Sequence, residues 1–182
     1  MNAAILGLAA FAVSLLTLFS GFGLGTLLLP AFLLFFPAPV AVAATAVVHL
    51  LNNLFKLGLL RRNVSRSVLL RFGLPAVLAA FPGALLLARL SRTEDAVTFS
   101  IAGRTVTTTV LGLVMGGLIL VFAAIELVPA LYRFRVGARW LPAGGVLSGF
   151  FGGLSGHQGA LRSAFLVKMS LSAEQFVGTN AI

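Results

Sequence analysis

The sequence predicts an all-α fold, a polytopic bundle of transmembrane helices, and three observations carry that prediction. Of the 182 residues, 59% are hydrophobic and only 9% are charged, and the mean hydropathy is +1.09. A soluble domain carries about 25% charged residues, so this chain has too few polar side chains to cover itself in water. No Asp, Glu, Lys or Arg occurs between Met1 and Phe55, a stretch long enough for two crossings of about 20 residues each.

Five full spans and the beginning of a sixth follow from the apolar stretches. The first stretch has about 34 residues and would reach about 50 Å as one helix, too long for one untilted crossing. It contains a glycine cluster at its middle, and the fifth stretch contains another, so we expect both to be broken helices. The stretches are Ala3–Phe36, Val40–Leu60, Val68–Leu90, Thr105–Val128, a fifth from Trp140 and a sixth from Ser172. The glycines assigned to the breaks are Gly21, Gly23, Gly25, Gly156 and Gly159.

The formal charge of +9 is distributed in the gaps between the apolar stretches. This is the pattern of arginines that flank membrane helices, so we expect no nucleic-acid partner. The connectors that follow the second and fourth spans hold eight cations, against three in the connector between them. The positive-inside rule then places those two connectors in the cytoplasm and, by parity, the N-terminus too. We expect a multi-pass protein of the cytoplasmic (inner) membrane.

Several kinds of chemistry are excluded by residue usage. The chain has no cysteine, which excludes disulfides, thiolate metal sites and cysteine nucleophiles. Its two histidines and four acids are scattered, so no metal site is expected. There is no phosphate-binding Gly-x-x-x-x-Gly-Lys-Ser/Thr motif and no soluble domain to carry one. We therefore expect no cofactor and no use of ATP.

The two broken segments belong to an internal repeat with an offset of 134 residues. Gly25 matches Gly159, and Thr45 matches Thr179. Duplicated halves with discontinuous helices are typical of secondary transporters. We assign residues 1–132 to a first transmembrane repeat and 133–182 to the start of a second. A helix that stopped at Ile182 would leave unpaired carbonyls in the bilayer, so we expect this second half to be incomplete.

These motifs resemble the sulfite exporter TauE/SafE family of membrane permeases, and the resemblance covers the whole chain. The matching runs are Ser20–Gly25 with Pro30, Ala43–Thr45, Gly149–Gly159 and Val177–Asn180. The resemblance implies a protein that moves small sulfur-containing or organic anions. Where family members often have glycine runs, this chain has His157 and Gln158, and we count Gln158 among the candidate substrate-binding residues.

A polar stripe in the second span is the first candidate site. Thr45, His49, Asn52 and Lys56 follow one another at helical spacing and fall within about 60° of one helix face. Polar groups inside a span usually face the bundle interior or a water-filled cavity. An imidazole, an amide and an ammonium there could bind an anion, and the imidazole could change charge near neutral pH. The alternative is hydrogen bonding between helices, with Lys56 reaching toward the interface.

Arg162 is the second candidate, because it follows the second glycine break. A helix that begins near Gly159 would direct its free amide groups and a positive partial charge toward the break, and Arg162 would add a full charge. The matching residue of the first half is Leu28. The alternative is an arginine at the membrane interface.

The remaining motifs have structural interpretations. Gly145, Gly149 and Gly153, and also Gly112 and Gly116, are spaced for close packing of helices. Glu126 is expected at an interface, with a proton carrier as the alternative.

Three functions remain open. The first is a permease that moves a small anion such as sulfite or an organosulfonate, driven by a gradient of substrate or protons, with the lipid bilayer as its environment. The second is a non-transporting membrane scaffold or assembly subunit. The third is an intramembrane serine protease, suggested by Gly153–Gly156 as Gly-Leu-Ser-Gly. Its serine needs a histidine within reach, and in a continuous helix His157 would lie on the opposite side from Ser155.

Overall fold

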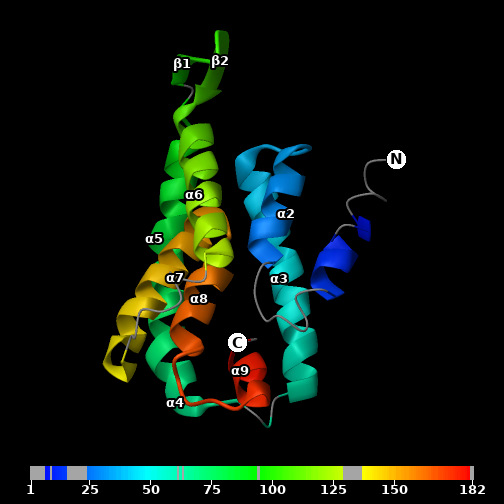
Figure 1. Cartoon of the computed structure of the whole chain (residues 1–182), viewed down its shortest axis with the longest axis vertical. Coiled ribbons are helices and arrows are strands. Elements are labelled where there is room, and N and C mark those ends of the chain that lie inside the picture. Colours follow the sequence, from blue (N-terminus) through cyan, green and yellow to red (C-terminus); the bar gives the residue numbers. More distant parts are fainter. Residues whose placement is uncertain are drawn as a thin grey trace.

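The computed structural model is a helix bundle with a short β-hairpin at one end (Figure 1). It describes residues 7–8, 10–15, 24–60, 62, 64–93, 95–128 and 137–180. Within that part, three helices are long and apolar enough to cross a membrane: Ala38–Leu59, Arg66–Leu90 and Val110–Leu127. The predicted bundle of transmembrane helices is confirmed.

The element boundaries lie close to the predicted ones for most spans. In chain order, the elements before the hairpin are α2 (Leu24–Leu33), α3 (Ala38–Leu60), α4 (Arg66–Val68), the π-helical turn η2 (Leu69–Gly73) and α5 (Leu74–Leu90). After the hairpin of β1 (Ala96–Ile101) and β2 (Arg104–Thr109) come α6 (Val110–Leu127), η4 (Ala138–Trp140), α7 (Leu141–Ser155), α8 (Gln158–Leu166) and α9 (Ala173–Asn180). The second and third predicted spans thus correspond to α3 and to the continuous run from α4 through α5.

The fourth span begins later than predicted, because the chain first forms the hairpin. Strands β1 and β2 pair in antiparallel register from Ala96 with Thr109 to Ile101 with Arg104. Ala102 and Gly103 make the turn, with φ values of 50° and 77°, as a tight hairpin turn requires. The threonines of β2 are β-branched and favour a strand over a helix. Placing the helix start at Thr105 was wrong: Thr109 caps α6 by accepting a hydrogen bond from the Gly112 amide at 3.0 Å.

The fifth predicted span is a helical hairpin, and the expectation of one interrupted crossing was wrong. Helix α7 ends at Gly156, whose φ of 75° is in the left-handed region, and α8 then runs back along α7. Ser148 Oγ donates a hydrogen bond to the Gln158 carbonyl at 2.9 Å, while Gly144 lies against the ring of Phe165. Going back along α7 from Ser148 to Gly144 corresponds to going forward along α8 from Gln158 to Phe165, so the two helices are antiparallel.

Glycines bring α7 directly against the backbone of α5. A Cβ atom at any of three α7 glycines would overlap a carbonyl oxygen of the α5 segment. The α7 glycines and the carbonyl oxygens that they approach both advance by four residues in the same chain direction. The two helices therefore run parallel, and the small glycines allow them to pack closely. The pairs are Gly145 with Phe72, Gly149 with Ala76 and Gly153 with Ala80. The other predicted pair does not pack this way: a Cβ on Gly112 would meet its own Thr108 hydroxyl, and one on Gly116 would meet nothing within 4 Å.

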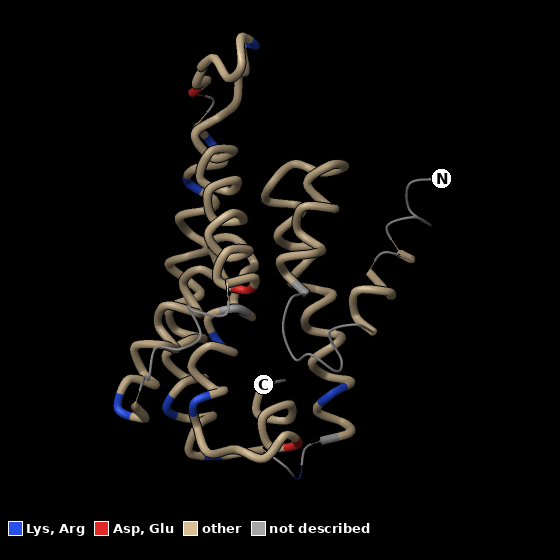
Figure 2. Tube along the Cα trace, viewed as in Figure 1, with Lys and Arg blue, Asp and Glu red and all other residues tan. Residues whose placement is uncertain are grey.

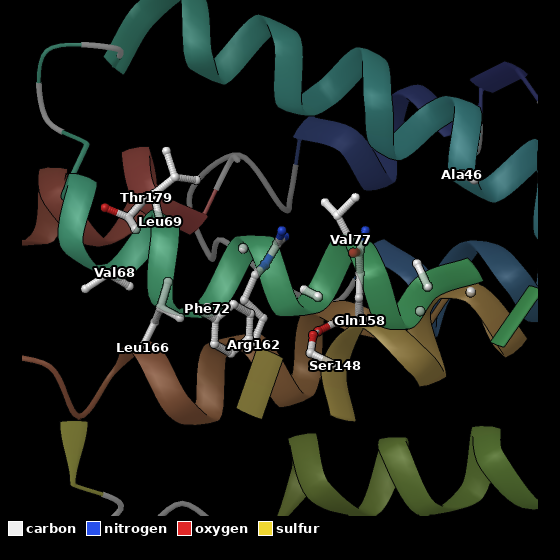
Figure 3. A pocket seen from close by; sticks show the side chains of 16 residues that line it. Ala46, Val68, Leu69, Phe72, Val77, Ser148, Gln158, Arg162, Leu166 and Thr179 are labelled. Atoms are coloured by element: carbon white, nitrogen blue, oxygen red, sulfur yellow. The ribbon is translucent and has the colours of Figure 1, made fainter. Parts of the chain in front are cut away.

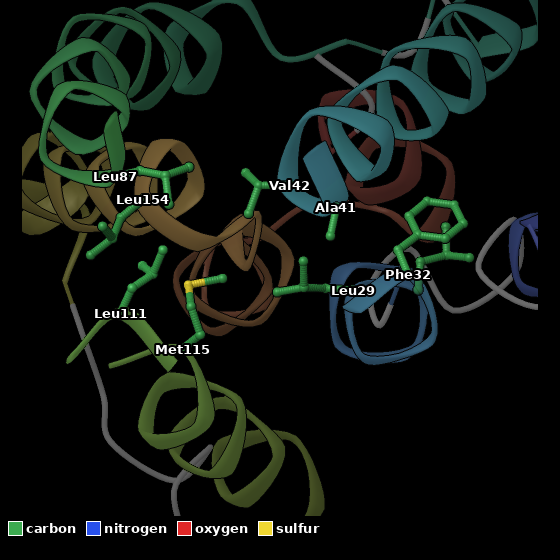
Figure 4. Close-up of a cluster of buried hydrophobic side chains, with 9 residues drawn as sticks. Leu29, Phe32, Ala41, Val42, Leu87, Leu111, Met115 and Leu154 are labelled. Atoms are coloured by element: carbon green, nitrogen blue, oxygen red, sulfur yellow. The ribbon is translucent and has the colours of Figure 1, made fainter. Parts of the chain in front are cut away.

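Apolar side chains from α2, α3, α5, α6 and α7 meet in one core (Figure 4). The labelled members Leu29 and Val42 face Met115 and Leu154 across the centre of the bundle. All four are at most 6% exposed. This core fixes the short helix α2 against the long ones and thereby positions its first turn.

The charged residues lie mostly at the ends of the bundle (Figure 2). Basic residues gather at the end formed by α4 and the beginning of α7, and the hairpin lies at the opposite end (Figures 1 and 2). The described parts of the two basic connectors predicted to share one side of the membrane, around α4 and at the beginning of α7, are therefore at the same end of the bundle. The predicted cytoplasmic N-terminus falls on residues outside the described part.

The repeat is visible in the helix boundaries. Helices α2 and α8 begin at Leu24 and Gln158, which are 134 residues apart, the offset found in the sequence. In Figure 1, α2 runs from the middle of the bundle toward the hairpin end, whereas α8 runs from the middle toward the α4 end. The two short helices thus point in opposite directions, as in inverted repeats.

Candidate functional site

The first turn of α2 touches the turn between α7 and α8. A Cβ on Gly25 would lie 2.5 Å from the Gly156 carbonyl oxygen and 3.4 Å from His49 Nε2. On the other side of this contact, Thr45 Cγ2 lies 3.6 Å from the Cβ position of Gly156. We call this meeting point, made by Gly25, Thr45, His49 and Gly156, the junction. The predicted break residues Gly21 and Gly23 lie outside the described part of the chain.

Two helix N-termini converge on the junction. Gly25 is the second residue of α2, which has 10 residues, and Gly156 is two residues before α8, which has nine. The first amide groups of a helix have no partner within it, and they carry the positive end of its dipole. Gly159, predicted at the break, is inside the first turn of α8. The N-termini of α2 and α8 therefore both lie at the junction, where α7 also ends, with its C-cap at Gly156 and the negative end of its dipole.

The polar stripe of α3 faces the interior of the bundle. Its four members are buried, at 0% exposed for Thr45, 7% for His49, 9% for Asn52 and 4% for Lys56. Thr45 donates its hydroxyl hydrogen to the Ala41 carbonyl at 2.8 Å, and His49 Nε2 has no hydrogen-bond partner in the described part. An unpaired ring nitrogen beside two helix N-termini is available to a ligand.

Asn52 points to a different place from His49. Its Nδ2 donates to the Ser14 carbonyl at 3.2 Å. Ser14 belongs to the helical residues 10–15, which with α3 enclose an apolar cavity of about 380 Å³. The structure thus brings Thr45 and His49 to the junction but connects Asn52 to the N-terminal helix.

A second cavity, of about 280 Å³, opens beside the junction between α3, α5, α7, α8 and α9. Arg162 and Gln158 line it from α8, and in Figure 3 both side chains extend from α8 alongside α5 toward α3. Arg162 is 8% exposed, and its Nε makes no hydrogen bond in the described part. Ser148 and Thr179 add hydroxyl groups to the wall. The volume is several times the share of one water in the liquid, about 30 Å³, so a small anion fits.

The two sites lie close to the same charged side chains. His49 is within Coulombic range of Arg162 and Lys56, and Lys56 is within range of Arg162. Buried like charges repel unless an anion lies among them. Arg162 and Lys56 therefore make this part of the bundle favourable for an anion.

Ser155 and His157 lie closer together than a continuous helix would allow. The break at Gly156 brings His157 Nδ1 to 3.2 Å from Ser155 Oγ, so the expectation that they lie on opposite sides was wrong. The same nitrogen is 2.9 Å from the Ser155 carbonyl oxygen, which can only accept, so Nδ1 carries the hydrogen. The Ser155 hydroxyl donates to the Phe151 carbonyl at 2.9 Å.

One polar contact near the junction was not predicted. Thr26 Oγ1 donates to Glu126 Oε1 at 2.8 Å, which connects the first turn of α2 to the end of α6. The sequence had suggested an interfacial position for Glu126 and had not singled out Thr26. The available signal was a hydroxyl directly after Gly25 in an otherwise apolar run.

Comparison with known proteins agrees with this architecture. A family model described as "Sulfite exporter TauE/SafE" matches residues 6–182. Comparisons with curated proteins and with solved structures gave no match. Within the described residues, no group of three His, Cys, Asp or Glu side chains could hold a metal ion. Because the match extends over nearly the whole sequence, the chain belongs to the sulfite exporter TauE/SafE family of membrane transporters.

Proposed function

We propose that this protein is a permease of the cytoplasmic membrane that moves a small anion, sulfite or an organosulfonate, through the junction, driven by a gradient. The observation that carries the proposal is the contact of Gly25 with Gly156. It places the N-termini of two oppositely directed short helices at one point. In transporters with broken helices, such N-termini face the anionic group of the substrate.

The side chains around the junction suit an oxyanion. Arg162 offers planar, paired donors that match two oxygens of a sulfite, sulfonate or carboxylate group. Gln158 and His49 would add single hydrogen bonds from opposite sides, since they belong to α8 and α3. These donors do not distinguish sulfur from carbon oxyanions, so the preference for sulfur follows from the family.

The inverted arrangement of the two short helices supports a rocking motion. Helix α2 packs on α3, whereas α8 packs on α7, so each half-helix moves with its own partner. Displacing the α7–α8 hairpin relative to α2 would open the junction toward one end of the bundle or the other. We propose this as the alternating-access step.

The two alternatives are less well supported. A protease needs a free base beside its serine, but His157 Nδ1 already donates to the Ser155 carbonyl. In the described part of the chain, Arg162 is buried, lines a cavity and has an Nε without a hydrogen-bond partner. Such a group is costly in a membrane, and a scaffold does not require one. Both features are expected of a binding site, and we propose no catalytic activity.

Arg162→Leu tests the proposal, because leucine occupies the matching position in the first half and leaves no polar group behind. The variant should lose sulfite, alkylsulfonate and carboxylate transport into liposomes while reaching parental levels in membranes. Arg104→Leu, in the exposed hairpin, is the matched control and should transport normally. Parental transport of all three anions by Arg162→Leu would show that the anion binds elsewhere.

A further inference from the structure

A carboxyl group lies close to the junction, in a part of the bundle where the anion site would otherwise be surrounded by donors. Glu126 is the residue before the last in α6, and α6 ends about midway along the bundle (Figure 1). It is half-buried and accepts one hydrogen bond, from Thr26. A charge at this depth is costly without a partner, and a proton is a partner that a carboxylate can always take up.

The elements packed against α6 supply no cation to this carboxyl in the described part of the chain. Helices α2 and α7 carry no titratable side chain. The charged or titratable side chains on the others are His49, Lys56, Arg89, Arg104, His157 and Arg162. His157 stacks on Phe122, one turn before Glu126, but the Thr26 hydroxyl is the polar group that acts on Glu126 itself.

The hydrogen bond connects this carboxyl to the anion site in two steps. Thr26 directly follows Gly25, and Gly25 contacts both Gly156 and His49. A change at Glu126 therefore acts on the first turn of α2, which forms one side of the junction. A negative carboxylate here would repel an anion at the junction, whereas a neutral carboxylic acid would not.

We propose that Glu126 is the proton-binding site that couples anion movement to proton movement in the same direction. The proton binds a carboxylate oxygen while the anion occupies the junction, and both leave on the other side. Because each removes repulsion for the other, the two bindings strengthen one another reciprocally. This inference rests on the proposed function and adds the coupling ion and its residue.

The test compares two measurements on purified protein in liposomes, each corrected for protein-free liposomes. The first is exchange of labelled sulfite at equal pH, and the second is sulfite accumulation driven by a pH gradient. Glu126→Gln keeps an acceptor for Thr26 but cannot take up a proton. It should retain exchange and lose about tenfold in pH-driven accumulation, a loss typical of coupling between two sites. Asp95→Asn, in the exposed connector, should retain both.

The outcomes separate this inference from the proposed function. A parent protein without sulfite exchange overturns the proposed function, and this inference with it. A parent that exchanges sulfite, with Glu126→Gln accumulating it equally well, overturns this inference alone. Equal loss of exchange and accumulation in Glu126→Gln assigns a structural role and also overturns it. Thr26→Val, which removes the hydroxyl at similar volume, should lower pH-driven accumulation and keep exchange; parental accumulation would exclude α2 as the connection.

Discussion

His49 is the imidazole that reaches the junction, with its Nε2 3.4 Å from the Cβ position of Gly25. His49→Ala should weaken anion transport, because it removes a ring nitrogen that has no partner in the described part of the chain and is available to the anion. Uptake at several substrate concentrations measures the loss of apparent affinity. Val47→Ala, on the exposed face of the same helix, is the control. Unchanged transport by His49→Ala would remove the imidazole from the proposed site.

For single residues, the local sequence pattern predicted which polar side chains are buried but not which residues they contact. Helical spacing placed Thr45, His49 and Asn52 on one face, and all three are buried. Spacing within one helix contains no information about the neighbour opposite each turn. His49 faces Gly25, whereas Asn52 faces Ser14. The contact between Thr26 and Glu126 joins residues 100 positions apart, and no local pattern predicts such a pair.

The packing of α7 on α5 provides a prediction about helices. Gly149→Ala places a methyl group onto the Ala76 carbonyl oxygen, so the helices must separate along their length. Overpacking of this kind costs about 1–3 kcal/mol. We expect a lower melting temperature in detergent and reduced transport.

Gly116→Ala is the matched control, because its new methyl group meets nothing within 4 Å and alanine favours a helix. Its melting temperature should equal or exceed that of the parent. Equal melting temperatures for Gly149→Ala and Gly116→Ala would mean that α5 and α7 do not pack through these glycines.

Elements were predicted well where composition alone decides and poorly where the chain reverses. The apolar stretches predicted α3 and the α4–α5 run within about two residues, because hydrocarbon thickness fixes span length. Glycines at 156 and 159 marked a break, but a glycine allows a reversal as readily as a kink. The reversal depends on Gly144 fitting Phe165 and on Ser148 bonding Gln158, which are contacts between two helices. The hairpin was missed because its threonine-rich strand adjoins an apolar helix.

For the whole molecule, the chain reversal between α7 and α8 invalidates one of the two arguments for membrane topology. Counting crossings from the N-terminus assumes that each broken segment crosses once, and the α7–α8 hairpin does not. The comparison of connectors does not need that count. The basic connector around α4 and the hairpin of β1 and β2 lie at opposite ends of the bundle joined by α5 (Figure 1). We therefore expect them to face opposite sides of the membrane, independently of where the N-terminus lies.

The absence of cysteine from the sequence allows a direct test of this topology. Ser67, exposed in α4, and Ser100, exposed in β1, can each be replaced by a single cysteine without a background thiol. Because cytoplasmic connectors hold the excess of Lys and Arg, we expect the Ser100→Cys variant to react with an impermeant maleimide on intact cells. The Ser67→Cys variant should react only after the membrane is opened, which also serves as the control for reactivity. Labelling of Ser67→Cys on intact cells, with Ser100→Cys protected, would invert the proposed orientation and place the basic end of the bundle outside.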